Sequence, residues 1–377
     1  MTPHAMREQC DVRRQRSLRP DASSRPPRER STARAGVRWV SARIRTVILF
    51  GRLAFCASLS FLWAATTPAE EIAYVEWPHW GAASSKLILQ PAPGGTPKVI
   101  AAYPSDVVSG FDWSRSARLF AVDLWDTGRP VGTTTRMSFL DRTGRPAGDG
   151  TLAPQGPEHS PAWSPNGRLL AVARTWRVHV LDPATGMSRH IETTGSQDQY
   201  PTWSPDGRRI AFSSNWDARF WAAPDQRSVD IHVFGIDGDH VRNVTQSVED
   251  ELEAAWSPTG RHMAYIQYRG GDAHGVVRIL DLSTDRAWDI TEPTVHLLPA
   301  SPDWSADGQQ IAFVAGERRD DTRLGRNVYT ADLTGDHIVK ITDYTARAAL
   351  SARWVDGALP AVARRSATTT WAGLRKP

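Results

Sequence analysis

Three acidic residues at one position of a repeated motif are the clearest candidates for a chemical or binding role in this sequence. Glu158, Asp198 and Glu251 each lie five residues before a tryptophan, and the motif around that tryptophan recurs along the chain. Repeats arranged around an axis would bring residues of one register together. Carboxylates gathered in this way focus a negative potential that attracts a cationic segment, and they could also bind a hard divalent cation through oxygen.

Neighbouring residues could extend this acidic arc. They are His159, Gln199, Tyr200, Asp250 and Glu253. The other copies of the motif have Val108, Pro299 or Ala349 at the same register, so the acidic residues occupy three successive copies. The alternative interpretation is a set of solvated loop carboxylates, which are common on any protein surface.

A second candidate site is the insertion Asn215–Arg227, which contains three large aromatic side chains: Trp216, Phe220 and Trp221. An exposed patch of this kind could bind a partner, because tryptophan and arginine are enriched at interface hot spots. The insertion could equally fold back and cover its own repeat. The sequence favours neither interpretation.

Six related units must position these residues. The clearest is Pro201–Ser213, reading PTWSPDGRRIAFS, in which a tryptophan precedes a tight turn and a short apolar run. Pro205 presets φ at the second turn position, and Gly207 closes the turn. The unit therefore predicts a β-hairpin with a large aromatic residue at its shoulder. The repeated tryptophans are Trp113, Trp163, Trp203, Trp256, Trp304 and Trp354.

Strand-rich repeats of about 40–50 residues are typical of propeller blades. We predict an all-β, six-bladed β-propeller of four-stranded antiparallel blades over residues 70–377. The sixth blade is split, with its inner strand and hairpin in Arg353–Arg364 and its outer strands in Leu87–Tyr103. Strands from the two ends of the chain therefore pair in one blade and close the ring. Both Ile72–Trp77 and Leu359–Ala363 fit the second strand of that blade. The tryptophans are expected to fill the wedges between neighbouring blades.

The motif copies WSPNG, WSPDG, WSPTG and WSADG resemble the WSPDG-type, WD40-like repeat of the TolB-like β-propeller family. The resemblance covers most of the chain after about residue 70. It implies a propeller that binds a protein or peptide at the cell envelope. Residues 1–69 leave no room for the amino-terminal α/β domain that accompanies the propeller in TolB proteins, so we expect a stand-alone propeller.

Residues 1–69 are expected to be a basic leader. They contain 13 arginines and 4 acidic residues, whereas the remaining chain carries 32 basic and 37 acidic groups. The uncharged run Leu53–Ala69 has the character of a signal peptide and is shorter than the roughly 20 apolar residues of a membrane span. We therefore predict export to the periplasm or cell envelope, with no stable membrane span after processing. A retained anchor is the alternative.

Five common catalytic or cofactor-binding motifs are missing from the sequence: GxSxG, HExxH, CxxC, a P-loop and a strand-associated GxGxxG. We predict a non-enzymatic monomer without cofactor or metal, which binds a protein or peptide with a cationic segment through its channel mouth. The basic charge lies in the leader, so we expect no nucleic-acid binding. The alternatives are a metal-assisted lyase, lactonase or hydrolase that uses the carboxylates and His159, and a regulatory propeller of a separate serine hydrolase.

Overall fold

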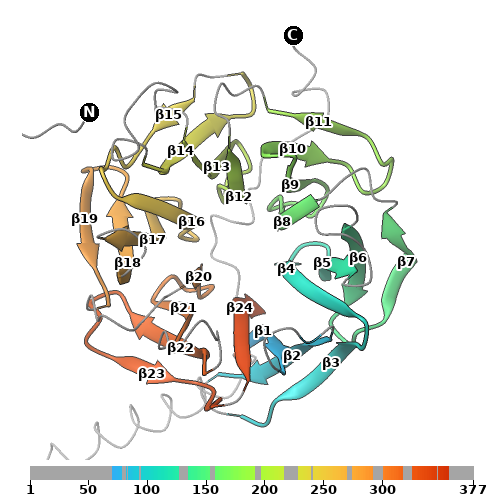
Figure 1. Ribbon diagram of the computed structural model, residues 1–377. Helices are drawn as coiled ribbons and strands as arrows, with labels where there is room; N and C mark the ends of the chain where they lie inside the picture. Colours follow the sequence, from blue (N-terminus) through green and yellow to red (C-terminus); the bar gives the residue numbers. More distant parts are fainter. Residues whose placement is uncertain are drawn as a thin grey trace, which may run out of the picture. The chain divides into compact units, whose positions relative to one another are not determined.

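In the described residues, twenty-four strands form six four-stranded antiparallel sheets around a central axis (Figure 1). The computed structural model describes residues 70–78, 82, 84–92, 95–126, 135–152, 158–191, 197–215, 228–238, 241–269, 274–291, 300–316, 325–345 and 347–355. The innermost strands of neighbouring blades are in contact all the way round the ring. The chain therefore has the predicted six-bladed propeller fold. The described residues contain no helix that could cross a membrane.

Blades 1 to 5 follow one another along the chain, and in each the first strand lies next to the channel. Blade 1 contains β4 (Asp106–Ser114), β5 (Leu119–Asp126), β6 (Thr135–Asp141) and β7 (Pro146–Leu152). Blade 2 contains β8 (Glu158–Trp163), β9 (Leu170–Arg174), β10 (Arg177–Leu181) and β11 (Ser188–His190). Blade 3 contains β12 (Asp198–Trp203), β13 (Arg209–Ser214), β14 (Asp230–Gly235) and β15 (Arg242–Asn243). Blade 4 contains β16 (Asp250–Trp256), β17 (His262–Arg269), β18 (His274–Asp281) and β19 (Arg286–Asp289). Blade 5 contains β20 (Ala300–Trp304), β21 (Gln310–Ala315), β22 (Asn327–Asp332) and β23 (Ile338–Lys340).

Blade 6 joins the two ends of the described chain. Its strands, from the channel outwards, are β24 (Ala348–Val355), β1 (Glu71–Trp77), β2 (Ser85–Pro91) and β3 (Lys98–Tyr103). The antiparallel pairing of β1 with β24 confirms the predicted closure and assigns the second strand to the amino-terminal segment. The inner strand β24 begins at Ala348, before the expected start at Arg353, which corrects that boundary; residues 356–364 of the expected hairpin lie outside the described residues. As in the other blades, the repeat tryptophan lies at the end of the inner strand, not at its beginning.

The turn after each tryptophan forms a compact polar unit, best seen in blade 3. The amide of Gly207 donates to the carbonyl of Ser204 at 2.8 Å, and Gly207 has a φ of 69°. The hydroxyl of Ser204 donates to Asp206 Oδ1 at 2.5 Å and accepts from the amide of Arg209 at 2.9 Å. Serine, aspartate and glycine therefore close the hairpin without help from the rest of the blade.

Each repeat tryptophan packs against the preceding blade and is only 3–8% exposed. Trp354, for example, shares a core cluster with Val314 and Val328 of blade 5. The turn of the preceding blade adds a cover, because the Arg209 guanidinium lies 4.8 Å from the ring centroid of Trp256. Six such wedges, one at each junction, join the blades into a ring.

Candidate functional site

The inner strands bend where they pass the central channel. The residue three positions before the tryptophan has a left-handed backbone in four blades, with φ of 55° at Ser160, 52° at Tyr200, 56° at Glu253 and 52° at Ser301. The pairing with the second strand slips at this place in all six blades. These are β-bulges, which disrupt the ladder locally and re-aim side chains.

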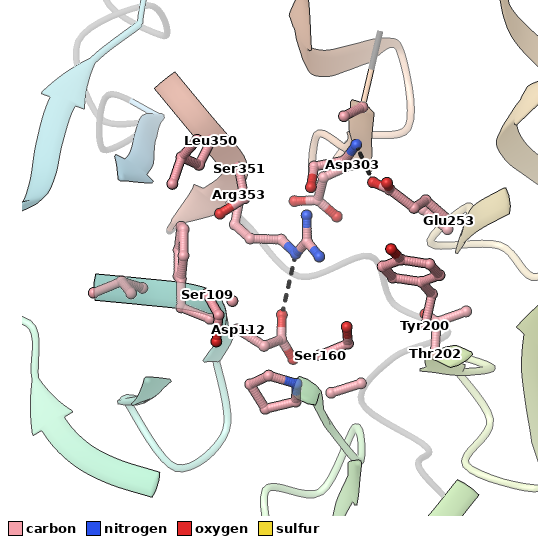
Figure 2. Close-up of a pocket in the computed structure, with 18 of the residues that line it drawn as sticks. Ser109, Asp112, Ser160, Tyr200, Thr202, Glu253, Asp303, Leu350, Ser351 and Arg353 are labelled. Atoms are coloured by element: carbon pink, nitrogen blue, oxygen red, sulfur yellow. Dashed lines mark hydrogen bonds and ion pairs between the residues drawn. The ribbon is translucent and has the colours of Figure 1, made fainter. Parts of the chain in front are cut away.

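The bulges direct polar side chains into a cavity of about 410 Å³ in the channel (Figure 2). The cavity is lined from all six inner strands. One set of lining residues comes from the bulge position itself: Gly110, Ser160, Tyr200, Glu253, Ser301 and Ser351. A second set comes from the position directly before the tryptophan: Asp112, Ala162, Thr202, Ala255, Asp303 and Arg353.

Arg353 lies between Asp112 and Asp303 in this cavity (Figure 2). Its Nε atom is 3.7 Å from Oδ1 of Asp112. Burial raises the pKa of Asp112 to about 6, although the Arg353 charge opposes that effect. Burial also raises the pKa of Asp303, again against the charge of Arg353. Two carboxylates of reduced acidity therefore share one guanidinium at the centre of the ring.

The same carboxylates connect neighbouring blades. Asp112 accepts a hydrogen bond from the amide of Trp163 at 2.7 Å, and Asp303 accepts one from the amide of Trp354 at 2.7 Å. Glu253 likewise accepts from the amide of Ser301 in the following blade. Each carboxylate thus binds the inner strand of the next blade with one oxygen. Their positions are fixed by the ring before any ligand arrives.

A smaller cavity of about 200 Å³ lies at the hairpin-turn end of the channel. All six repeat tryptophans and three turn prolines, Pro165, Pro205 and Pro258, contribute to its wall. Asp112 and Asp303 line both cavities and so mark the section between them. A ligand entering the wide cavity would meet these two side chains at its floor.

Two of the expected acidic residues do not lie at the channel. Asp198 is 0% exposed and Glu251 is 1% exposed, and neither lines the central cavity. Asp198 accepts a hydrogen bond from the Ser214 hydroxyl at 2.6 Å, and Glu251 accepts one from the Gln267 amide at 2.8 Å. The bulge is the reason, because one extra residue in the strand turns every side chain before it to the other face.

The remaining sequence-based candidates are spread over several places. Tyr200 and Glu253 lie in the wall of the central cavity. His159 has a half-exposed side chain whose Nδ1 is 3.6 Å from the buried Asp123, while Asp250 accepts from the amide of Val229 at 2.8 Å. The side chain of Glu158 and the insertion residues Trp216, Phe220 and Trp221 lie outside the described residues. Among the side chains that are described, no three His, Cys, Asp or Glu residues gather as a metal site would require.

The fold and its polar channel define a six-bladed β-propeller, and solved structures of TolB proteins are similar to it. TolB from Acinetobacter baumannii aligns with a TM-score of 0.59 and 17% identity, over 82% of this chain and 74% of that chain. A putative TolB from Agrobacterium tumefaciens aligns with a TM-score of 0.53 and 16% identity, over 77% of this chain and 100% of that chain. A chain of a nidogen/laminin complex aligns with a TM-score of 0.56 and 11% identity, over 76% of this chain and 98% of that chain.

Sequence comparison finds a shorter relationship. The Tol-Pal system protein TolB of Alcanivorax borkumensis is 31% identical over 77 residues, which is 20% of this chain. The match spans 17% of that relative, about a sixth of its length. No profile of a protein family matches the chain. TolB proteins are thus found by both comparisons, over the whole propeller fold in the solved structures and over a short segment in the sequence.

Proposed function

We propose that this protein is an exported, non-enzymatic propeller that binds a protein or peptide partner at the cell envelope through its central cavity. The observation that carries the proposal is the convergence of polar side chains from all six inner strands on one cavity of about 410 Å³. A space of that size takes a few side chains of an inserted segment and excludes a folded domain. The partner would therefore present a loop or an extended end.

The charges of the cavity favour a cationic segment. The carboxylates of Asp112, Glu253 and Asp303 line it together with two guanidinium groups, those of Arg326 and Arg353. A lysine or arginine of the partner could compete with Arg353 for Asp303 and lie against the Tyr200 ring, which stands near Glu253 in Figure 2. Tyr200 and Glu253 thus keep the binding role suggested by the sequence, whereas the buried Asp198 and Glu251 do not belong to this surface.

The location at the envelope rests on two independent observations. The uncharged run Leu53–Ala69 follows a basic segment, as in an exported precursor. The curated relative from Alcanivorax borkumensis is named as a protein of the Tol-Pal system. We propose an envelope partner for this chain by analogy with that protein, and the analogy rests on a short aligned segment.

The proposal is tested by affinity purification of the processed protein from its own envelope fraction, followed by mass spectrometry and by binding measurements with a peptide from the captured partner. Glu253→Gln keeps an acceptor for the Ser301 amide and removes one charge. We expect it to weaken binding by about fivefold and to reduce the salt dependence of the affinity. Asp336→Asn, in an exposed turn of blade 5, is the matched control. Equal affinity and equal salt dependence in wild type and Glu253→Gln would remove the central cavity from the function.

A further inference from the structure

A third cavity, of about 420 Å³, lies at the junction of blades 3 and 4 and takes no part in the function proposed above. Its wall combines β15 and the segment that follows it with residues from all four strands of blade 4. Ser247 stands on the first side, and Glu251, Tyr265 and Gln267 stand on the second. Glu251, which the sequence suggested for the channel, belongs to this junction cavity.

The carboxyl group of Glu251 is incompletely hydrogen-bonded. The residue is 1% exposed, and its Oε1 accepts from Nε2 of Gln267 at 2.8 Å. Its Oε2 is buried and has no hydrogen-bond partner within the described part of the chain. Burial raises the pKa of Glu251 to about 7 and the charge of Asp230 adds to that effect, whereas the nearby side chains of Thr245, Gln267 and Ser247 oppose it. A buried acceptor without a donor is unfavourable, so a ligand that brings a donor would be stabilised here.

The junction of blades 5 and 6 has the same backbone arrangement. There the amide of Tyr344 donates to Oδ1 of Asn327 at 2.6 Å, and Asn327 begins β22. At the junction of blades 3 and 4 the amide of Ser247 donates to Oδ1 of Asp230 at 2.9 Å, and Asp230 begins β14. Both donors follow the outer strand of their blade. Tyr344 and Ser247 therefore occupy equivalent positions.

Tyr344 fills its junction with a phenol ring. Its hydroxyl is 3.2 Å from the hydroxyl of Tyr74, and the two rings meet edge to face with their centroids 6.4 Å apart. Although burial opposes it, hydrogen bonds from Tyr344 and Arg347 hold the pKa of Glu76 below its usual range. The occupant of this junction is thus a phenol whose hydroxyl meets a tyrosine and a buried carboxylate.

The polar groups that meet this phenol have counterparts at the open junction. Glu76 is paired with Ala349 across the two inner strands of blade 6, and Gln267 is paired with Glu251 at the same place in blade 4. The carboxylate is on the second strand in blade 6 (Glu76) and on the first strand in blade 4 (Glu251). Both carboxylates nevertheless lie on the same face of their sheets, because cross-strand neighbours share one face. A serine replaces the phenol, so the space remains open above an unpartnered carboxylate oxygen.

We infer that the cavity between blades 3 and 4 binds a small phenolic compound, with the ring placed as Tyr344 is placed at the other junction and the hydroxyl donating to Oε2 of Glu251. All seven tyrosines of the chain lie among the described residues, so no other tyrosine of the chain is left to fill the cavity. The phenol must come from outside the chain. The site is separate from the central channel and needs no protein partner.

Titration of the processed wild-type protein with 4-methylphenol, followed by calorimetry, tests this inference. Toluene is the matched ligand without the hydroxyl, and we expect it to bind at least tenfold more weakly, because a hydrogen bond to a buried carboxylate contributes about that factor. N-acetyltyrosinamide represents a tyrosine of a partner protein. Tighter binding of N-acetyltyrosinamide than of 4-methylphenol would overturn the assignment to a small molecule, and failure of 4-methylphenol to bind at millimolar concentration would overturn the site itself.

Two variants locate the binding. Ser247→Tyr should fill the cavity from within, as Tyr344 fills the other junction, and abolish binding of 4-methylphenol without lowering the melting temperature. Glu251→Gln should weaken binding roughly tenfold. Unchanged affinity in Ser247→Tyr would place the ligand elsewhere and refute the inference.

A reciprocal variant tests the equivalence of the junctions. Tyr344→Ser should open a second site, so that 4-methylphenol raises the melting temperature of this variant more than that of the wild type. If Tyr344→Ser does not fold, Ser247→Tyr and Glu251→Gln still decide whether 4-methylphenol binds in the cavity between blades 3 and 4. An equal rise in both proteins would show that the two junctions are not equivalent and would refute the placement of the ring.

The last test concerns the aromatic insertion Asn215–Arg227. The hydroxyl of Ser228, directly after the insertion, donates to the carbonyl of Ser247 in the cavity wall at 2.9 Å, so the insertion ends beside the cavity. We expect a variant with Trp216, Phe220 and Trp221 all replaced by alanine to bind 4-methylphenol as the wild type does. Binding that appears only in this variant would identify the insertion as the occupant and overturn the inference of an external ligand.

Discussion

Replacement of Asp112 by asparagine should stabilise the propeller at pH 8 and leave its stability almost unchanged at pH 4. The Asp112 side chain is 21% exposed in the narrow part of the channel, and it accepts from the amide of Trp163. Asparagine retains an acceptor and nearly the same volume, so mainly the charge is lost. The difference in stability between the variant and the wild type therefore shows which of two opposing effects is larger, the desolvation of the carboxylate or its attraction to Arg353.

The size of the effect follows from the pKa of Asp112, which burial raises from an ordinary value of 3.8 to about 6. The difference of about two pH units corresponds to about 2–3 kcal/mol. Because the folded state binds this proton more tightly than the unfolded state, the contribution is fully present below about pH 4 and is lost as the pH rises through 6. Asparagine cannot ionise, so Asp112→Asn should escape this loss.

Urea unfolding followed by tryptophan fluorescence at pH 4, 6 and 8 measures the difference. The free energy of unfolding of Asp112→Asn should exceed that of the wild type by about 2–3 kcal/mol at pH 8, by less at pH 6 and by almost nothing at pH 4. Asp336→Asn, on an exposed turn, is the control. A variant that is less stable than the wild type at pH 8 would show that the attraction to Arg353 outweighs desolvation and would refute the reasoning.

Three further predictions concern the ring and the leader. Trp304→Ala should lower the free energy of unfolding by about 3–5 kcal/mol, because its ring is buried between blades 4 and 5, whereas the same change at the exposed Trp176 should alter it by about 0.5 kcal/mol or less in the same titration. Deletion of residues 348–377 should expose the edge of β1, with broader unfolding and aggregation visible by size-exclusion chromatography; a truncated protein that unfolds as sharply as the full chain would contradict the closure. Amino-terminal sequencing of the protein from the envelope fraction should find a start near Glu70, and recovery of Met1 would argue against export.

The fold could be predicted because its determinants are local and periodic. The turn Ser204–Gly207 closes by contacts within its own few residues, and the tryptophan before it marks the end of each inner strand. Recurrence of that unit fixes the number of blades. The split blade was harder to place, because the worn copy around Trp354 lacks the turn motif and left the position of its inner strand uncertain by several residues.

The site could be predicted only in part, because its geometry depends on bulges that the sequence does not signal. A left-handed backbone normally suggests glycine, yet Ser160, Tyr200 and Ser301 adopt it in the inner strands. Counting along a regular strand therefore directed attention to Asp198, on the wrong side of the bulge. The pairing of Asp112 with Arg353 also depends on residues from different blades, and only the closed ring brings them together.

The pairing of β1 with β24 also has a consequence for the order in which the molecule forms. Arg347 donates to Glu76 across 271 positions of the chain. Closing so long a loop costs about 3 kcal/mol more than closing a ten-residue hairpin, so we expect the hairpins of single blades to form first and this joint to form last. Until the final strand has been synthesised, β1 presents an unpaired edge. A chain that stops early would keep that edge, and chaperones and proteases could thereby distinguish an unfinished molecule from a complete one.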